Sequence, residues 1–241
     1  MKIKVILALI AVLAGVLLFI FKRNKPAAKP EDKPKFSDEE YDRYYKVKEE
    51  ALERILGPMH DMVGHAIIPF QIGGAVDMYY FPNGIPGTGF ATMELIEPDG
   101  SGPRPNRIGT FELVAFTRHK MPSSEGKSDK THPFNQIKRR MCGILTVVGR
   151  YSYDAVLNPG DTCEIPGDEG EPAKCLIFDE YRGTNDADFA IGGKRHCLLL
   201  CLEVFRSEME YAMPHGSAVV LRKLKEKGYY PYSDLDREPV F

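Results

Sequence analysis

Apolar side chains recur at helical spacing soon after Ser37. Ser37 and Glu40 have the spacing of a capping box, which marks a helix start. Gly57 and Pro58 stand where such a helix would end. The Glu and Lys residues in between form a face that we expect to be solvated. The apolar positions lie three or four residues apart: Tyr44, Val47, Ala51 and Ile55.

A second segment, within residues 134–148, has the same periodicity. Lys138, Arg139 and Arg140 fall on its expected solvent face. The pattern predicts an amphipathic helix whose buried positions are Phe134, Ile137, Met141, Ile144, Leu145 and Val148.

The last helical region begins at Ser207, with Glu210 in the capping-box position. Pro214 is expected to break this helix after fewer than two turns. A further helical piece follows over residues 219–224 and ends by Gly228. The remaining tail is expected to be irregular.

Strand patterns lie between these helices. Residues 175–178 predict a strand, and residues 189–191 and 196–205 predict a hairpin around the Gly192-Gly193 turn. The order of helices and strands predicts an α+β fold with a mixed or antiparallel sheet and flanking helices. Four earlier segments are rich in β-branched and aromatic residues: 65–70, 75–81, 89–96 and 110–117.

The N-terminus carries a run from Val5 to Phe21 without a polar side chain. As a helix these seventeen residues would span about 25 Å, the short end of what a bilayer core requires. Lys2 and Lys4 precede the run, and a Lys22-Arg23-Asn24-Lys25 segment follows it. The pattern favours a single-pass signal-anchor helix that leaves the protein in the membrane.

A cleaved signal peptide is the alternative interpretation. The apolar core of a signal peptide is usually shorter than this run, and its cleavage site needs small neutral residues where this chain has Lys22 and Arg23. We therefore expect three parts: a transmembrane anchor with basic flanks (1–25), a Pro/Lys-rich linker (26–36) and a globular domain (37–241).

Charge separates these parts. Basic residues outnumber acidic ones around the anchor, and more of them follow it than precede it, which favours a cytoplasmic globular domain over an external one. The whole chain has a net charge of −2, whereas residues 36–241 carry 24 Lys and Arg against 32 Asp and Glu. An acidic domain lacks the basic face that nucleic-acid binding needs.

The five cysteines match no zinc-site spacing. Cys197 and Cys201 lie in an apolar run and are expected to be buried. Cys163 and Cys175 flank an acidic loop; their separation would permit a disulfide in an oxidising compartment, whereas both would be free thiols in the cytoplasm. Cys142 has no such partner in the pattern.

No histidine cluster predicts a metal centre. His60, Asp61 and His65 are close in sequence, but a five-residue step separates the two imidazoles on a helix and on a strand alike. The remaining histidines are scattered, so we expect neither a metal nor another cofactor. They are His119, His132, His196 and His215.

Catalytic patterns are equally weak. Gly84, Gly87 and Gly89 precede a strand rather than a helix, so they indicate a turn and not a phosphate loop. Four carboxylates on or beside strands could meet for acid–base chemistry, but nothing in the sequence fixes their separation. These are Asp77, Glu94, Glu97 and Glu112.

Several segments together resemble suppressor-of-fused-like (SUFU) domains of the bacterial type. The resemblance covers most of residues 60–241, in short motifs of moderate specificity. It implies an α+β domain that binds another protein and has no catalytic motif. The segments are 76–82 (VDMYYFP), 89–93 (GFATM), 111–116 (FELVAF), 158–162 (NPGDT), 201–216 and 236–240 (DREPV).

The leading hypothesis is therefore a membrane-tethered, non-enzymatic protein-binding module, with an acidic surface and tyrosine-bearing loops. Bacterial members of the family include candidate immunity proteins, so the resemblance implies an immunity or regulatory role. One alternative is a membrane-anchored hydrolase that uses sheet carboxylates with His60 or His119. Another is a structural protein that tethers the cell envelope.

Overall fold

The computed structural model describes residues 36–122, 129–167 and 170–241, and residues 37–241 form one compact unit. The predicted anchor (1–25) and all but the last residue of the linker (26–36) lie outside the described residues. Within the described ranges, no helix is both long and apolar enough to span a bilayer.

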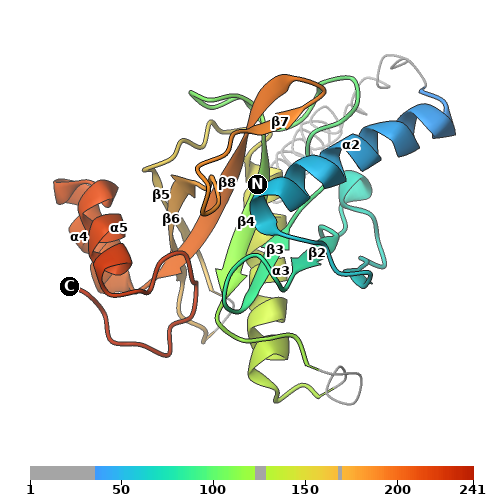
Figure 1. Ribbon diagram of the computed structural model, residues 1–241. Helices are drawn as coiled ribbons and strands as arrows, with labels where there is room; N and C mark the ends of the chain where they lie inside the picture. The colour runs from blue at the N-terminus through green and yellow to red at the C-terminus, as the bar shows by residue number, and fades with distance from the viewer. Residues whose placement is uncertain (1–35, 123–128, 168–169) are drawn as a thin grey trace, which may run out of the picture. The chain divides into compact units, whose positions relative to one another are not determined.

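A mixed eight-stranded sheet forms the centre of this unit (Figure 1). The strand order is β1-β2-β3-β4-β8-β6-β5, and β7 pairs with β8 off this path. The β4–β8 pair is parallel, and the other pairs are antiparallel. The strands are β1 (Val63–Gly64), β2 (Met78–Phe81), β3 (Thr88–Ala91), β4 (Phe111–Thr117), β5 (Thr162–Ile165), β6 (Lys174–Glu180), β7 (Phe189–Ile191) and β8 (Lys194–Val204).

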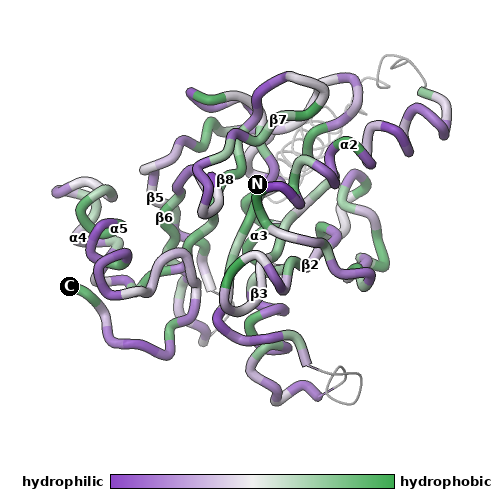
Figure 2. Tube along the Cα trace, viewed as in Figure 1, coloured by the Kyte–Doolittle hydropathy of each residue, from purple (hydrophilic) through white to green (hydrophobic). Residues whose placement is uncertain are grey.

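Helices cover both faces of the sheet. The helices α2 (Asp38–Leu56), α4 (Arg206–His215) and α5 (Ser217–Glu226) pack in one apolar cluster, and α3 (Pro133–Tyr151) packs in the other. Hydrophobic residues follow the central strands (Figure 2).

Strand β8 contributes side chains to both apolar clusters, because successive side chains of a strand point to opposite faces of the sheet. Leu198, Leu200 and Leu202 face the α2 side, while Cys197 and Cys201 face α3. The predicted burial of these two cysteines is confirmed.

The first predicted helix is confirmed as α2, including its capping box between Ser37 and Glu40. Its solvated face is only partly as expected, because Lys48 is completely buried. The second helix is confirmed as α3. Here Arg140 is not simply solvated, since its guanidinium binds the buried carboxylate of Glu203.

The strand predicted over residues 65–70 is wrong. The short strand β1 precedes it, and residues 65–74 form a loop that contains the 3₁₀ turn η1 (Phe70–Ile72). Pro69 lacks the N–H that a sheet ladder needs, and its neighbour Ile68 is exposed to solvent.

The strand predicted over residues 89–96 is shorter, because β3 ends at Ala91. Beyond it the carboxylate of Glu112 accepts hydrogen bonds from the backbone N–H groups of Leu95 (3.3 Å) and Ile96 (3.0 Å). These amides thus bind a buried side chain instead of a neighbouring strand.

The last helical region also differs from its prediction. Helix α4 begins at Arg206, and Glu208, not Glu210, accepts the N–H of Phe205. Pro214 lies within the last turn of α4, and the break comes at Gly216, whose φ of +86° favours glycine.

Candidate functional site

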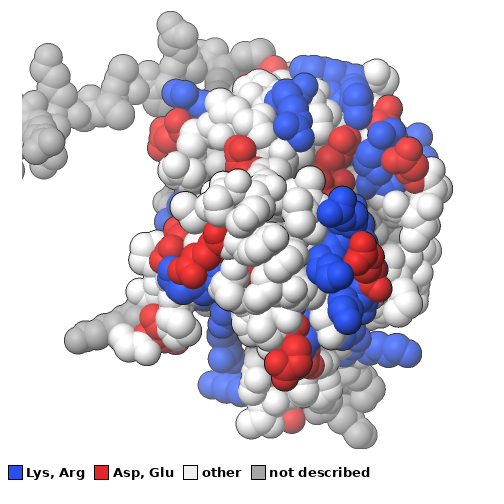
Figure 3. Space-filling model, turned by 90° about the vertical axis from the view of Figure 1, so that its left-hand side faces the viewer, with Lys and Arg blue, Asp and Glu red and all other residues white. Residues whose placement is uncertain are grey.

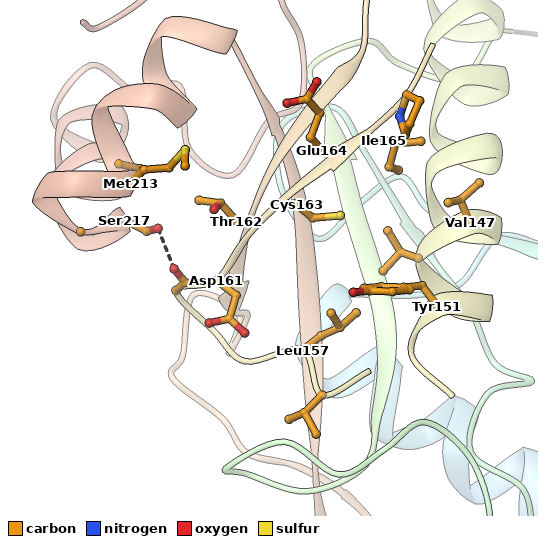
Figure 4. Close-up of a pocket in the computed structure, with 16 residues that line it drawn as sticks. Val147, Tyr151, Leu157, Asp161, Thr162, Cys163, Glu164, Ile165, Met213 and Ser217 are labelled. Carbon is orange, nitrogen blue, oxygen red and sulfur yellow. Dashed lines mark hydrogen bonds between the residues drawn. The ribbon is translucent and has the colours of Figure 1, made fainter. Parts of the chain in front are cut away.

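A groove of about 890 Å³ lies between α3 and α4, beside the edge strand β5 (Figure 4). Strand β5 is the last strand of the sheet, and in the described part of the chain no strand pairs with its outer edge. The lining residues come from α3, the 156–166 segment with β5, and the α4–α5 junction. The groove therefore lies at the open edge of the sheet, between the helices that cover its two faces.

The outer edge of β5 presents backbone groups to this groove. The carbonyl of Asp161 accepts a hydrogen bond from the N–H of Phe178 (2.9 Å), so the backbone C=O of Asp161 points toward β6. Alternation along an antiparallel pair then turns the N–H and C=O groups of Thr162 and Glu164 outward. Such a row of groups is a template for another strand.

Apolar side chains form both walls. Val147 (46 % exposed) and Tyr151 (52 %) project from α3, and Met213 (69 %) projects from α4. Val156 adds a further exposed apolar group. Exposed apolar surface of this kind, next to unpaired backbone groups, is typical of an interaction site.

Polar groups at the groove are held by local contacts. Ser217 Oγ donates to the carbonyl of Gly160 (2.7 Å, Figure 4). Asp161 Oδ2 accepts the N–H of Asn158 (2.8 Å). Arg206 binds the Glu164 carboxylate through both terminal nitrogens, and this hydrogen bonding lowers the pKa of Glu164.

The charge around this groove is mixed. Figure 3 views the side on which α4 and α5 lie, and there Lys and Arg alternate with Asp and Glu around a largely uncharged surface. The negative charge expected for the whole domain is thus not concentrated on this face.

Cys163 lies at the floor of the groove and faces the α3 cluster. Burial raises the pKa of its thiol, which disfavours the nucleophilic thiolate. The disulfide that the sequence permits does not form. The register pairs Cys163 with Leu176 and Glu164 with Cys175, so the two sulfur atoms point to opposite faces, and all five cysteines are free.

The histidines considered from the sequence do not converge. His60 Nδ1 accepts the N–H of Met62 (2.9 Å), whereas His65 Nδ1 lies 2.8 Å from Asp77 Oδ2. Among the residues described, no group of three or more His, Cys, Asp or Glu side chains is arranged to hold a metal ion.

The other histidines serve local structure. His132 caps α3 by accepting the N–H of Phe134, and His215 stacks on Tyr211. His196 is buried against Thr110, and burial lowers its pKa.

His119 is half-exposed, and its Nε2 lies 3.7 Å from Asp234 Oδ1. It lines a separate cavity of about 540 Å³ with Arg140 and Asp236. The carboxylate of Asp234 is already bound by Thr117 Oγ1 (2.5 Å) and by the N–H of Arg118 (2.7 Å).

Of the four strand carboxylates, only Glu112 lies in the core, whereas Asp77, Glu94 and Glu97 are half-buried. Glu112 forms a fully buried ion pair with Lys48 (2.9 Å) and also binds Thr92 Oγ1 (2.7 Å). Burial, followed by the charge of Glu112, raises the pKa of Glu94 to about 7. Glu94 in turn accepts the N–H of Asp77 (2.6 Å).

Lys48 is the member of this group that the sequence interpretation missed. Its ammonium also donates to the carbonyls of Met93 and Ile96, both at 2.6 Å. The available signal was its position, four residues after Tyr44 and four before Leu52, on the apolar face of α2.

No protein-family model matches the sequence, and no curated protein matches it either. Solved structures do match the fold. The crystal structure of the Sufu–Fu complex aligns with a TM-score of 0.55 and 16 % identity, over 83 % of this chain and 92 % of that chain. A suppressor-of-fused homologue from Neisseria gonorrhoeae aligns with a TM-score of 0.53 and 12 % identity, over 83 % and 97 %. The chain therefore has the fold of suppressor-of-fused (SUFU) domains, a mixed sheet with flanking helices.

Proposed function

We propose that this protein is a membrane-tethered, non-enzymatic module that binds an extended segment of another protein along β5. The open edge of β5 between two apolar helix walls carries the proposal. A segment added there would continue the sheet through the outward backbone groups of Thr162 and Glu164.

The walls define the chemistry of such a partner. Side chains of an added strand alternate, so one set would contact Val147 and Tyr151 and the other set Met213. The segment should therefore be apolar on both faces. A hydrogen-bond donor near Asp161 would complement its carboxylate.

The comparison with solved structures supports a protein partner. One of the similar structures is itself a complex, of Sufu with Fu. The resemblance in the sequence implies the same kind of role, regulatory or immunity-related. An immunity role requires a toxin as the partner, and co-expression with the product of a neighbouring toxin gene would test it.

The geometry favours binding over hydrolysis. The two carboxylates that line the groove already accept hydrogen bonds, Asp161 from the N–H of Asn158 and Glu164 from Arg206, and among the described lining residues there is no histidine to act with them. Glu112 is paired with Lys48 in the core, and neither side chain is exposed to solvent.

Membrane tethering rests on the sequence of residues 1–25. The apolar run from Val5 to Phe21 is long enough for a short spanning helix, and its basic flanks favour a cytoplasmic domain. The 26–36 linker would then keep the domain close to the bilayer.

A pull-down with the full-length protein tests the binding role. Val147→Asp places a charge in the groove wall and should abolish capture of the partner. Val47→Asp is the matched control, because Val47 is also exposed and helical but lies on α2, away from the groove. Equal capture by wild type and Val147→Asp would refute the proposed site.

A further inference from the structure

Three isoleucines project from the loop of residues 65–74, hereafter the isoleucine loop. Ile67 is fully exposed (102 %), Ile72 is 76 % exposed and Ile68 is 55 % exposed. Single exposed apolar residues are ordinary on protein surfaces, but three in one short loop mark a contact surface.

The loop is held firmly in this shape. Phe70 is buried against Gly149 and close to Tyr153, which anchors the middle of the loop in the α3 cluster. Arg150 donates hydrogen bonds to the carbonyls of Gly73 and Gly74. The isoleucines are therefore presented by a fixed scaffold.

The beginning of the loop is fixed by Asp77. Its Oδ1 accepts the N–H of Ala66 (2.8 Å), and its Oδ2 lies 2.8 Å from His65 Nδ1. Both ends of the loop are thus tied to the body of the domain, and the exposed isoleucines lie between them.

Basic side chains lie near the start and the end of the loop. A cavity of about 360 Å³ begins at Gly64 and His65, and Lys130, Lys138 and Arg139 line it together with Asp129. Arg150 stands at the other end of the loop. An apolar protrusion with basic neighbours suits the interface of an anionic bilayer, where the apolar tip meets acyl chains and the cations meet headgroups.

The loop also lies at the end of the domain where α2 begins. Tyr153, next to Phe70, donates to the carbonyl of Leu95 (3.4 Å), and Tyr44 of α2 donates to the carbonyl of Ile96 (3.2 Å). The 26–36 linker reaches at most about 40 Å when fully extended. A domain attached to an anchor through the start of α2 therefore stays within reach of the bilayer at this end.

The groove remains accessible in such an arrangement. Val147 and Tyr151 of α3 line the groove, while Thr146 and Arg150 of the same helix bind the segment that carries the isoleucine loop. The two surfaces thus use different sides of α3.

We propose that the isoleucine loop inserts into the interfacial region of an anionic bilayer and so fixes the orientation of the tethered domain. This inference rests on the proposed membrane tether. The loop gives the domain a second membrane contact, with the β5 groove left free for the partner protein.

Tryptophan fluorescence provides the test, because the chain contains no tryptophan. The full-length Ile67→Trp protein is reconstituted in vesicles of phosphatidylcholine and phosphatidylglycerol with brominated acyl chains. We expect blue-shifted emission and loss of most of its intensity to bromine quenching. Val156→Trp, at an exposed apolar position in the groove, is the matched control and should stay unquenched.

Flotation of the same samples separates the outcomes. Ile67→Trp protein that floats with the vesicles while its indole stays water-exposed overturns the loop insertion and leaves the tether intact. Protein that does not float overturns both. Equal quenching of both reporters also overturns insertion. So does a blue shift of the Ile67→Trp emission that is insensitive to bromine, because a protein surface would then cover the loop. Ile72→Trp repeats the measurement at a second position.

Discussion

At the residue scale, the buried pair of Lys48 and Glu112 ties α2 to the sheet. The ammonium has three oxygen acceptors, and the rings of Tyr44 and Tyr45 lie about 5 Å from it. The sequence shows Lys48 on the apolar stripe of α2 but gives no hint of its partner, which lies 64 residues away. Long-range pairing of this kind does not follow from local periodicity.

Replacing Lys48 tests this pair. Lys48→Met leaves the Glu112 carboxylate buried without its counter-ion, so we expect the free energy of unfolding of the 37–241 fragment to fall by about 3–5 kcal/mol. Denaturant titration measures it. Lys46→Met, at an exposed position of the same helix, should change it by no more than about 0.5 kcal/mol. Similar values for both variants would contradict the pairing.

Glu94 makes the stability depend on pH. Its pKa is about 7 in the folded chain, against 4.5 as its ordinary value. The stabilisation that the protonated Glu94 side chain gives to the folded state is complete below pH 4.5 and is lost as the pH rises to 7. The reason is that the unfolded chain releases this proton at a lower pH than the folded chain does. The loss amounts to about 3 kcal/mol at most.

Unfolding of the 37–241 fragment at pH 4.5 and at pH 7.5 measures this effect. Glu94→Gln should remove the Glu94-dependent part of the difference and stabilise the protein at the higher pH. Glu50→Gln, an exposed carboxylate on α2, should behave as wild type. An unchanged pH profile for Glu94→Gln would show that Glu94 titrates normally.

At the element scale, regular amphipathic patterns were sufficient to predict α2 and α3, and the Gly192-Gly193 turn between apolar runs was sufficient to predict the β7–β8 hairpin. The failures occur where a side chain competes with the backbone ladder. Glu112 captures the amides that would have extended β3, and Pro69 prevents a strand in the isoleucine loop. These effects depend on tertiary contacts or on a single residue within an otherwise strand-like run.

The edge position of β5 could not be predicted either, because strand order depends on which distant strands pair. Thr162→Pro tests its role. It removes an outward N–H without breaking a ladder bond to β6, so the free energy of unfolding should change by less than about 1 kcal/mol. Partner affinity should fall at least tenfold, as the lost bond leaves an unpaired acceptor. Thr162→Val keeps the N–H and should bind nearly as wild type, whereas equal binding by all three proteins would exclude strand addition.

At the scale of the whole molecule, the resemblance in the sequence predicted the fold that the solved structures share. The groove was not predicted, since its walls come from α3 and α4, more than fifty residues apart. Only the folded chain brings Tyr151 and Met213 to the same sheet edge.

Removal of residues 1–25 tests the anchor. The full-length protein should remain with the membrane pellet after alkaline carbonate extraction, while the shortened protein should move to the supernatant, because it lacks the apolar run that would span the bilayer. If the full-length gene instead yields a mature product that begins after Ala28 and is recovered in the soluble fraction, residues 1–28 are a cleaved signal peptide.

Site-specific photo-crosslinking in intact cells tests the binding groove most directly. A photoreactive amino acid replaces Met213 at the groove wall, and the matched control carries it at Val47, which is exposed on α2. We predict a defined adduct with a partner protein from position 213, its loss when Thr162→Pro is added, and no such adduct from position 47. The absence of an adduct from position 213, or the same adduct from both positions, would contradict a partner bound along β5.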